Sequence, residues 1–210
     1  MGLSGMLIAG TIGAGALAIT LASVPFVAPG LRRVCLPYVP ATVRQLRHVA
    51  DALSKCDQNF ISPIVDLGSG DGRVVLQCAA LGHQSVGLEL NILLVLYSKY
   101  NARHQHLSHL ATFHRKDIFK ADLTKYRTAV IFGAELLMND LVPKLDEMLT
   151  GSYLIACRFP LPSNTRWRLI YKVGEGIDSV WLYEKCPYIV SKNSIRQLWD
   201  TSQIIYVLNS

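Results

Sequence analysis

This chain of 210 residues contains the segment Asp66-Leu67-Gly68-Ser69-Gly70-Asp71-Gly72-Arg73, in which three glycines alternate with other residues. The apolar run before it, 64–67, predicts a short buried strand, and residues 73–81 have helical character. Glycine has no Cβ, so Gly68 and Gly70 let the backbone turn sharply and let a ligand approach the main chain. A strand, a glycine turn and a helix in this order predict the first strand–turn–helix unit of a nucleotide-binding fold.

The rest of the chain continues the alternation of strands and helices. Further strands are predicted at 85–90, 111–114, 128–132 and 151–157, and helices at 91–103 and through 141–149. Two alternating segments, 166–173 and 179–184, are separated by Gly174-Glu175-Gly176 and predict a hairpin-type pairing. The predicted fold is a Rossmann-like α/β sheet of seven strands with an antiparallel edge hairpin, preceded by an N-terminal apolar helix.

The N-terminal segment 1–31 contains no charged residue, and its run 7–28 is long enough to cross ~30 Å of hydrocarbon as a helix. The first charges, Arg32 and Arg33, follow this run, whereas a cleaved signal peptide carries positive charge before its apolar stretch. We therefore expect a retained membrane or targeting segment. The two arginines predict that the rest of the chain lies on a cytosol-like or matrix-like side.

A linker and an amphipathic helix are predicted between this segment and the α/β domain. Thr42 can cap the helix, whose apolar residues keep helical spacing at Val43, Leu46, Ala50 and Leu53. The expected organisation is a hydrophobic segment at 1–31, the linker and helix at 32–56, the α/β domain at 57–185 and a C-terminal tail at 186–210.

The net charge of +6 comes from scattered basic residues, without a Lys/Arg run or an aromatic-interleaved basic motif. This pattern does not exclude nucleic acid, but an anionic membrane surface explains it equally well, so no nucleic-acid partner is predicted. Histidines gather at 104, 106, 109 and 114, and imidazoles are common metal ligands. The nearby carboxylate, Asp117, is a candidate for cofactor binding instead. We therefore interpret the four histidines as solvated and predict no metal.

The residue types around the glycine loop favour one kind of cofactor. A dinucleotide fold prefers a third glycine at position 73, where this chain has Arg73. S-adenosylmethionine has no pyrophosphate and carries an ammonium, a carboxylate and a sulfonium group. Acidic residues beside the loop suit that chemistry, and Asp66 and Asp71 provide them.

Two further carboxylates follow predicted strands. Glu89 ends the second strand, where it can accept hydrogen bonds from both ribose hydroxyls. Asp117 follows the third strand and can accept from the adenine amino group while Ile118 packs on the ring; the alternative is that Asp117 only caps a turn. The predicted cofactor-binding residues are Asp66, Gly68, Ser69, Gly70, Asp71, Gly72, Glu89, Leu90, Asp117 and Ile118.

Five segments carry a family resemblance: VCLPYVPAT (34–42), VDLGSGDGRV (65–74), VGLELN (86–91), ACRFPLP (156–162) and GEGID (174–178). They resemble the seven-strand methyltransferases, and among these the mitochondrial lysine methyltransferases of the ATP synthase c subunit and the adenine nucleotide translocase. Residues 130–133 and Arg158 look closer to the c-subunit branch. The resemblance implies transfer of a methyl group from S-adenosylmethionine to a lysine of a mitochondrial inner-membrane protein, with the catalytic domain facing the matrix.

The chain departs from the family at two places: Ile92-Leu93 replaces a Pro-Trp pair, and 186–210 has no recognised counterpart. Methyl transfer to an amine is an in-line displacement that depends mainly on positioning, although the lysine must first lose its proton, which a dry apolar pocket favours. The resemblance places Gly133-Ala134-Glu135 near the methyl group and Arg158-Phe159-Pro160 at the lysine channel. Glu135 either orients the amine or is a surface acid at a helix start, so no catalytic residue is assigned.

Two alternatives belong to other functional classes. A membrane-tethered, dinucleotide-dependent oxidoreductase could use the same loop, although Arg73 argues against it. A non-catalytic assembly factor could have lost the cofactor, although the intact Gly68, Gly70 and Glu89 argue against that loss. Within the methyltransferases, an Asn-Pro-Pro-Tyr type motif is absent, which argues against glutamine or DNA-amine acceptors.

Overall fold

The computed structural model describes residues 16, 40–133, 135–163 and 166–187. The apolar helix expected within 1–31 and almost all of the expected tail, 188–210, lie outside these residues. Among the residues that the structure does describe, no helix is long and apolar enough to cross a membrane.

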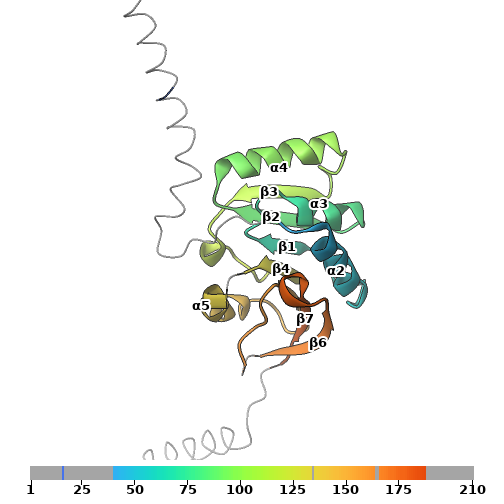
Figure 1. The fold of residues 1–210 in the computed structure, drawn as a ribbon, viewed down its shortest axis with the longest axis vertical. Helices are drawn as coiled ribbons and strands as arrows, with labels where there is room; N and C mark the ends of the chain where they lie inside the picture. Colours follow the sequence, from blue (N-terminus) through green and yellow to red (C-terminus); the bar gives the residue numbers. More distant parts are fainter. Residues whose placement is uncertain (1–15, 17–39, 134, 164–165, 188–210) are drawn as a thin grey trace, which may run out of the picture.

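The described residues form one seven-stranded mixed sheet, as predicted, in the order β3-β2-β1-β4-β5-β7-β6 (Figure 1). The strands are β1 (Ile64–Leu67), β2 (Ser85–Glu89), β3 (Ala111–Arg115), β4 (Thr128–Phe132), β5 (Tyr153–Cys157), β6 (Trp167–Val173) and β7 (Val180–Lys185). The first five are parallel to one another, whereas β7 is antiparallel to both β5 and β6. The last strand of the described residues therefore lies inside the sheet, and β6 forms the edge.

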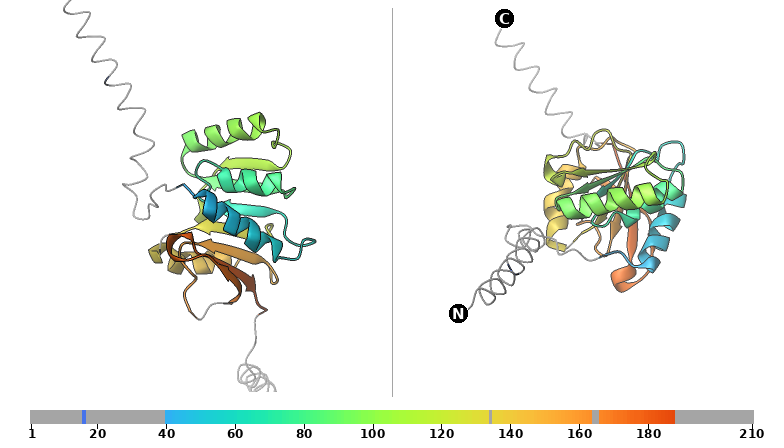
Figure 2. Two further views of the ribbon diagram at one scale, coloured as in Figure 1. Left: turned by 45° about the vertical axis from the view of Figure 1, so that its right-hand side comes forward. Right: turned by 90° about the horizontal axis from the view of Figure 1, so that it is seen from above.

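Helices cover both faces of this sheet. They are α2 (Val43–Ser54), α3 (Arg73–Ala80), α4 (Ile92–His104) and α5 (Glu135–Leu145). One core joins α2 and α3 to the central strands, a second joins α3, α4 and β3, and a third lies under α5. The view from above shows the strands between α2 and α5 (Figure 2). Because both faces are covered, β1 and β5 are buried along their whole length.

The predicted cap of α2 is confirmed, but its predicted apolar stripe is partly wrong. Thr42 Oγ1 accepts from the Gln45 backbone N–H at 3.1 Å, and Gln45 Oε1 accepts from the Thr42 N–H at 2.8 Å. Gln45 is fully buried because its amide also donates to the Ile177 carbonyl at 2.6 Å. Val43, which was predicted on the buried face, is 67% exposed. At the start of α2, the buried side chain is therefore a glutamine with its hydrogen bonds satisfied, rather than the apolar Val43.

Several predicted boundaries also differ from the structure, and two of these differences have a clear cause. The strand β2 ends at Glu89 rather than Leu90, because Asn91 accepts from the Leu93 N–H at 3.0 Å and caps α4. The helix predicted through 141–149 ends at Leu145. Beyond it, the Glu147 N–H bonds to the Lys144 carbonyl three residues earlier, which tightens the chain into turns.

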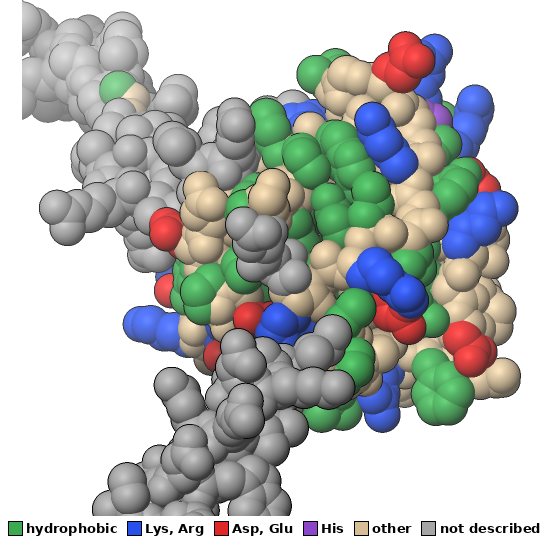
Figure 3. Space-filling model, turned by 90° about the horizontal axis from the view of Figure 1, so that it is seen from below, with side chains coloured by type: hydrophobic (Ala, Val, Ile, Leu, Met, Phe, Trp, Pro, Cys, Tyr) green, Lys and Arg blue, Asp and Glu red, His purple; other side chains and the backbone are tan. Residues whose placement is uncertain are grey.

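The face formed by the antiparallel strands is mixed in character. Seen from below, hydrophobic side chains lie open beside Lys and Arg side chains (Figure 3). On β6, Leu169 is 49% exposed and Ile170 is 38% exposed. This edge of the sheet lies at the opposite end from β3 and α4.

Candidate active site

The carboxyl ends of β1, β2 and β3 meet at one edge of the sheet. The strand β1 is parallel to β2, which is parallel to β3, with Leu67 opposite Leu88 and Glu89 opposite Arg115. The backbone N–H groups of Gly68 and Ser69 both donate to the Leu88 carbonyl, at 2.9 and 3.0 Å. These bonds hold the first turn of the glycine loop against the end of β2. Such an edge is where open α/β sheets bind ligands.

The glycines of the loop meet different needs. Gly68, Gly70 and Gly72 all have a positive φ, at 88°, 53° and 81°. A Cβ on Gly72 would lie 2.7 Å from both Phe113 and Ser98, whereas one on Gly68 would meet nothing within 4 Å. Gly72 is therefore required by packing as well as by its φ. Gly68 has open space before it, into which a ligand can approach the backbone.

Glu89 is fixed between the loop and the start of α4. Its Oε2 accepts from the Gly70 backbone N–H at 3.0 Å, and its Oε1 accepts from the Asn91 N–H at 2.8 Å. Each carboxylate oxygen can accept a second hydrogen bond. The side chain is half-buried, and Leu90 beside it is 39% exposed. The structure thus presents at the site a negatively charged acceptor with a fixed orientation.

Asp66 is a buried acid beneath this loop. Its side chain is 3% exposed, and its Oδ1 has no hydrogen-bond partner among the described residues. Burial raises the pKa of this carboxyl to about 8, and the nearby charges of Glu89 and Asp71 act in the same direction. The hydroxyl of Ser69 is likewise buried without a partner in the described part of the chain. Unpaired buried acceptors of this kind fit the ammonium group of S-adenosylmethionine.

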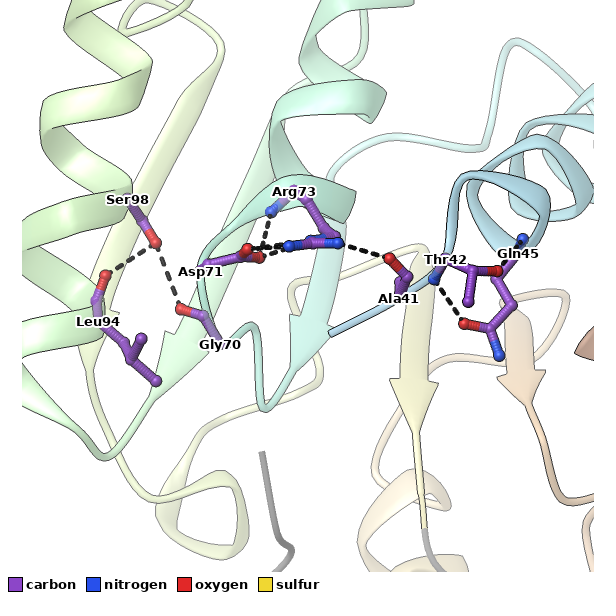
Figure 4. A network of polar contacts seen from close by, with 8 residues as sticks. All are labelled: Ala41, Thr42, Gln45, Gly70, Asp71, Arg73, Leu94 and Ser98. Atoms are coloured by element: carbon purple, nitrogen blue, oxygen red, sulfur yellow. Dashed lines mark hydrogen bonds and ion pairs between the residues drawn. The ribbon is translucent and has the colours of Figure 1, made fainter. Parts of the chain in front are cut away.

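Asp71 faces Arg73 (Figure 4). The Arg73 Nε donates to Asp71 Oδ1 and Oδ2 at 2.9 and 3.0 Å, Nη2 also donates to Oδ2, and Nη1 donates to the Ala41 carbonyl at 2.6 Å. The arginine at position 73 therefore joins the glycine loop to the residue before the Thr42 cap. Because Asp71 already has this partner, its predicted contact with a cofactor stays a prediction.

Two residues that the sequence pattern did not predict also shape the loop. Ser98 of α4 donates to the Gly70 carbonyl at 3.3 Å and to the Leu94 carbonyl at 2.9 Å (Figure 4). A Cβ on Gly87 of β2 would lie 2.6 Å from Ser69 Oγ. An isolated glycine inside a strand is a known signal of close approach and could have identified Gly87. A buried serine within a helix gives no such signal.

Asp117 and Ile118 reach the same edge of the sheet. The backbone N–H of Lys116 donates to the Glu89 carbonyl at 3.0 Å, so Asp117 and Ile118 follow directly after the end of β2 is reached. Asp117 Oδ1 accepts from the Phe119 N–H at 3.0 Å at the start of a short 3₁₀ helix. The turn-capping interpretation is thus confirmed for one oxygen, and the other accepts nothing from the described residues. Both side chains are half-buried.

The ends of β4 and β5 form the neighbouring part of the edge. Arg158 follows β5 with a φ of 74°, and its N–H donates to the Ser179 carbonyl at 2.9 Å. Phe159 packs against the core under α5. The Leu161 N–H donates to the Tyr183 hydroxyl at 3.1 Å, which fixes this loop to β7. Ala134 and the side chain of Glu135 lie outside the described residues.

The predicted histidine group shows no metal geometry. Within 40–133, 135–163 and 166–187, no three His, Cys, Asp or Glu side chains come together as a set of metal ligands. The described cysteines are free, with Cys56, Cys78 and Cys157 buried.

The fold and this edge define a class, the seven-strand methyltransferases. The structure resembles an RNA methyltransferase from Salinibacter ruber in complex with S-adenosyl-L-homocysteine, with a TM-score of 0.63 and 24% identity over 73% of this chain and 98% of that one. At this identity the likeness shows the fold alone.

Sequence comparison shows the family. The model of the ANTKMT methyltransferase domain matches residues 66–167. A lysine N-methyltransferase of the ATP synthase c subunit from Caenorhabditis elegans is 58% identical over 87% of this chain and 97% of its own length. The rat protein of the same name is 44% identical over 86% and 81%. The mouse adenine nucleotide translocase lysine N-methyltransferase is 38% identical over 74% and 68%.

The chain belongs to this family of lysine N-methyltransferases. It is an enzyme, and S-adenosylmethionine is its cofactor. The resemblance found in the sequence is confirmed, and the oxidoreductase and assembly-factor alternatives are set aside.

Proposed function

We propose that this enzyme transfers a methyl group from S-adenosylmethionine to a lysine side chain of the ATP synthase c subunit. The observation that carries this proposal is the shared name of the relatives that are 41–58% identical to the chain. The relative that acts on the adenine nucleotide translocase is more distant, at 38% identity. This difference favours the c subunit over the translocase as the substrate.

We infer the cofactor contacts from the side chains at the carboxyl ends of β1, β2 and β3. Glu89 accepts hydrogen bonds from the ribose hydroxyls, since its carboxylate is already oriented by Gly70 and Asn91. Asp66 faces the ammonium group, and the backbone at Gly68, Ser69 and Gly70 lies against the methionine part. The adenine ring lies near Leu90, Asp117 and Ile118. Asp71 and Gly72 are further contacts of the cofactor in this proposal, although Asp71 also binds Arg73 and Gly72 has no room for a Cβ beside Phe113.

The cofactor supplies a methyl group that is activated by the positive sulfur. The chain's own residues bind and orient the two reactants, and orientation alone provides a large part of the rate in such displacements. The acceptor lysine reaches the methyl group past Gly133 and Arg158, at the ends of β4 and β5. A guanidinium close to the incoming amine lowers the pKa of that amine, so Arg158 favours the neutral, nucleophilic form.

The organisation of the whole chain follows the same proposal. Residues 57–185 form the catalytic domain, 32–56 the linker and helix, and 186–210 a tail. Residues 1–31 attach the enzyme to the mitochondrial inner membrane, with the catalytic domain in the matrix. The uncharged run and the arginines at 32 and 33 support this orientation, and an acceptor in ATP synthase requires that location.

A methylation assay tests this function. Full-length enzyme is incubated with cofactor carrying a deuterated methyl group and with mitochondrial membranes from cells that lack the enzyme. Mass spectrometry of both the c subunit and the translocase then locates any labelled lysine. We expect label in the c subunit with Glu175→Gln, an exposed control, and strongly reduced label with Glu89→Gln. Label in the translocase alone, or in neither protein, contradicts the proposal.

A further inference from the structure

The helix α4 has an unusual distribution of side chains. The residues that it buries are Val95, Ser98 and Ala102, none of them large. Larger apolar residues point outward instead: Leu93 is 38% exposed, Leu96 55%, Tyr97 52% and Tyr100 63%. Helices of globular proteins usually place such residues against the core. The exposed side of α4 therefore resembles a contact surface that the described residues do not cover.

These four residues form one continuous stripe. Their spacing of i, i+3, i+4 and i+7 places Leu93, Leu96, Tyr97 and Tyr100 on one side of the helix. The imidazole of His104 continues the stripe, since it stacks on Tyr100 with ring centroids 6.1 Å apart. We call this set, Leu93 to His104 along the outer side, the α4 stripe. A monomeric protein rarely leaves a contiguous apolar stripe open unless something binds it.

The charged residues on α4 and along the chain that follows it to Lys116 are all basic. Lys99 and Arg103 are exposed, lie one turn apart along one flank of the stripe, and make no ion pair with the described residues. From Leu90 to Lys116 the sequence contains no Asp or Glu. Arg115 and Lys116, at the end of β3, flank the same surface. The partner of this surface is therefore apolar in part and negatively charged in part.

The position of α4 on the outside of the domain favours one kind of partner. In the view from above, α4 runs across the front of the domain, and no other described helix or strand lies in front of it (Figure 2). Its 13 residues span about 20 Å. An outward-facing helix that exposes leucines and tyrosines on one side and cations beside them matches a plane that has an apolar interior and anionic headgroups. Interfacial helices with this arrangement bury their apolar side at the headgroup boundary, and tyrosine is enriched at that depth.

We propose that the α4 stripe lies on the surface of an anionic lipid bilayer. Leu93, Leu96, Tyr97 and Tyr100 enter the headgroup boundary, and Lys99 and Arg103 contact the lipid phosphates. This contact is separate from any attachment through residues 1–31. Because the stripe starts just after Glu89 and Leu90, it also places the cofactor edge beside the bilayer.

A local probe of depth tests this contact in the full-length enzyme. Leu96→Cys is labelled with a fluorescent dye, and Leu169→Cys serves as the matched control, since Leu169 is 49% exposed on the far edge of the sheet. Both carry Cys35→Ser and Cys186→Ser, which leaves Cys56, Cys78 and Cys157 buried. Both proteins retain residues 1–31, so overall attachment is the same. Calorimetry with S-adenosylmethionine checks that each is folded.

The probes are vesicles of brominated phosphatidylcholine, with and without phosphatidylglycerol. We expect quenching at position 96 in the anionic vesicles, little quenching at 169, and loss of the effect in high salt. Lys99→Gln and Arg103→Gln should each reduce the fraction of enzyme whose α4 stripe lies on the vesicle surface about fivefold. Equal quenching of position 96 in both kinds of vesicle overturns the role of charge. If the dye at position 96 is not quenched, the lipid contact is overturned. If that dye becomes shielded from solvent only as the protein concentration rises, the lipid contact is also overturned and the result points to a protein partner.

Discussion

Arg73 donates a hydrogen bond to the carbonyl of Ala41 at 2.6 Å while its other nitrogens bind Asp71. One side chain thus connects the glycine loop to the segment that enters α2. We expect Arg73→Gln to lower the free energy of unfolding by about 1–2 kcal/mol, since it removes charge-assisted hydrogen bonds from a half-buried site. Urea unfolding measures this change.

The control for this prediction is Arg168→Gln. Arg168 pairs with Glu184 at 2.6 Å, but its side chain is 66% exposed. Solvent screens such a pair, so the expected loss is small. Equal losses in the two variants would show that Arg73 contributes no more than a surface arginine.

Gly72→Ala should destabilise the domain by about 2–4 kcal/mol. The change places a Cβ 2.7 Å from Phe113 and Ser98 and imposes an L side chain on a φ of 81°. Gly82→Ala is a matched comparison, because Gly82 has a φ of 91° but open space where the Cβ would lie. It should cost only about 1–2 kcal/mol. Thermal melts of both variants separate the packing contribution from the backbone contribution.

Glu89→Gln should weaken S-adenosylmethionine binding about tenfold to a hundredfold. The amide loses the negative charge, and its NH₂ group faces the N–H of Gly70 or Asn91, both of which need an acceptor. Calorimetry measures the dissociation constant, with Glu175→Gln as an exposed control. An unchanged constant for Glu89→Gln would remove this residue from the cofactor site.

Asp66 should make stability fall with rising pH. Its pKa is about 8 in the folded protein, against 3.8 ordinarily. Between about pH 4 and about pH 8 the unfolded chain loses this proton and the folded chain keeps it, so the free energy of unfolding decreases as pH rises through that window. Below the window the residue has no effect, and above it the full cost remains.

Asp66→Asn should abolish this part of the pH dependence and melt at a higher temperature than the wild type at the upper end of the window. The difference between the two proteins across the window is the measured quantity, because other groups titrate in both. Asp122→Asn, at an exposed site, serves as the control. Parallel curves for wild type and Asp66→Asn would mean that Asp66 is ionised in the folded protein.

Much of the fold could be predicted from the sequence because its signals are local. The glycines at 68, 70 and 72 all take positive φ, and the strand and helix beside them follow almost to the residue. The hairpin between β6 and β7 was also predicted, since both strands alternate. The position of β7 between β5 and β6 was not, because alternation alone does not say which strand pairs with β5.

The site was less predictable where a side chain depends on distant residues. Gln45 is buried because of a carbonyl at Ile177, which the spacing of apolar residues in α2 cannot show. The part played by Ser98 depends on the packing of α4 over the loop. Asp117 was predicted either to contact the adenine or to cap a turn. The structure shows the second role directly, as the hydrogen bond from the Phe119 N–H.

The place of β7 in the sheet has a consequence for biosynthesis. The strands β1 to β5 leave the ribosome first, yet β5 finds its antiparallel neighbour only when Val180–Lys185 has been made. Until then the open edge of β5 can pair with another nascent chain. The final strand of the domain therefore controls when the enzyme becomes safe from aggregation, and a premature stop codon before it leaves that edge exposed permanently.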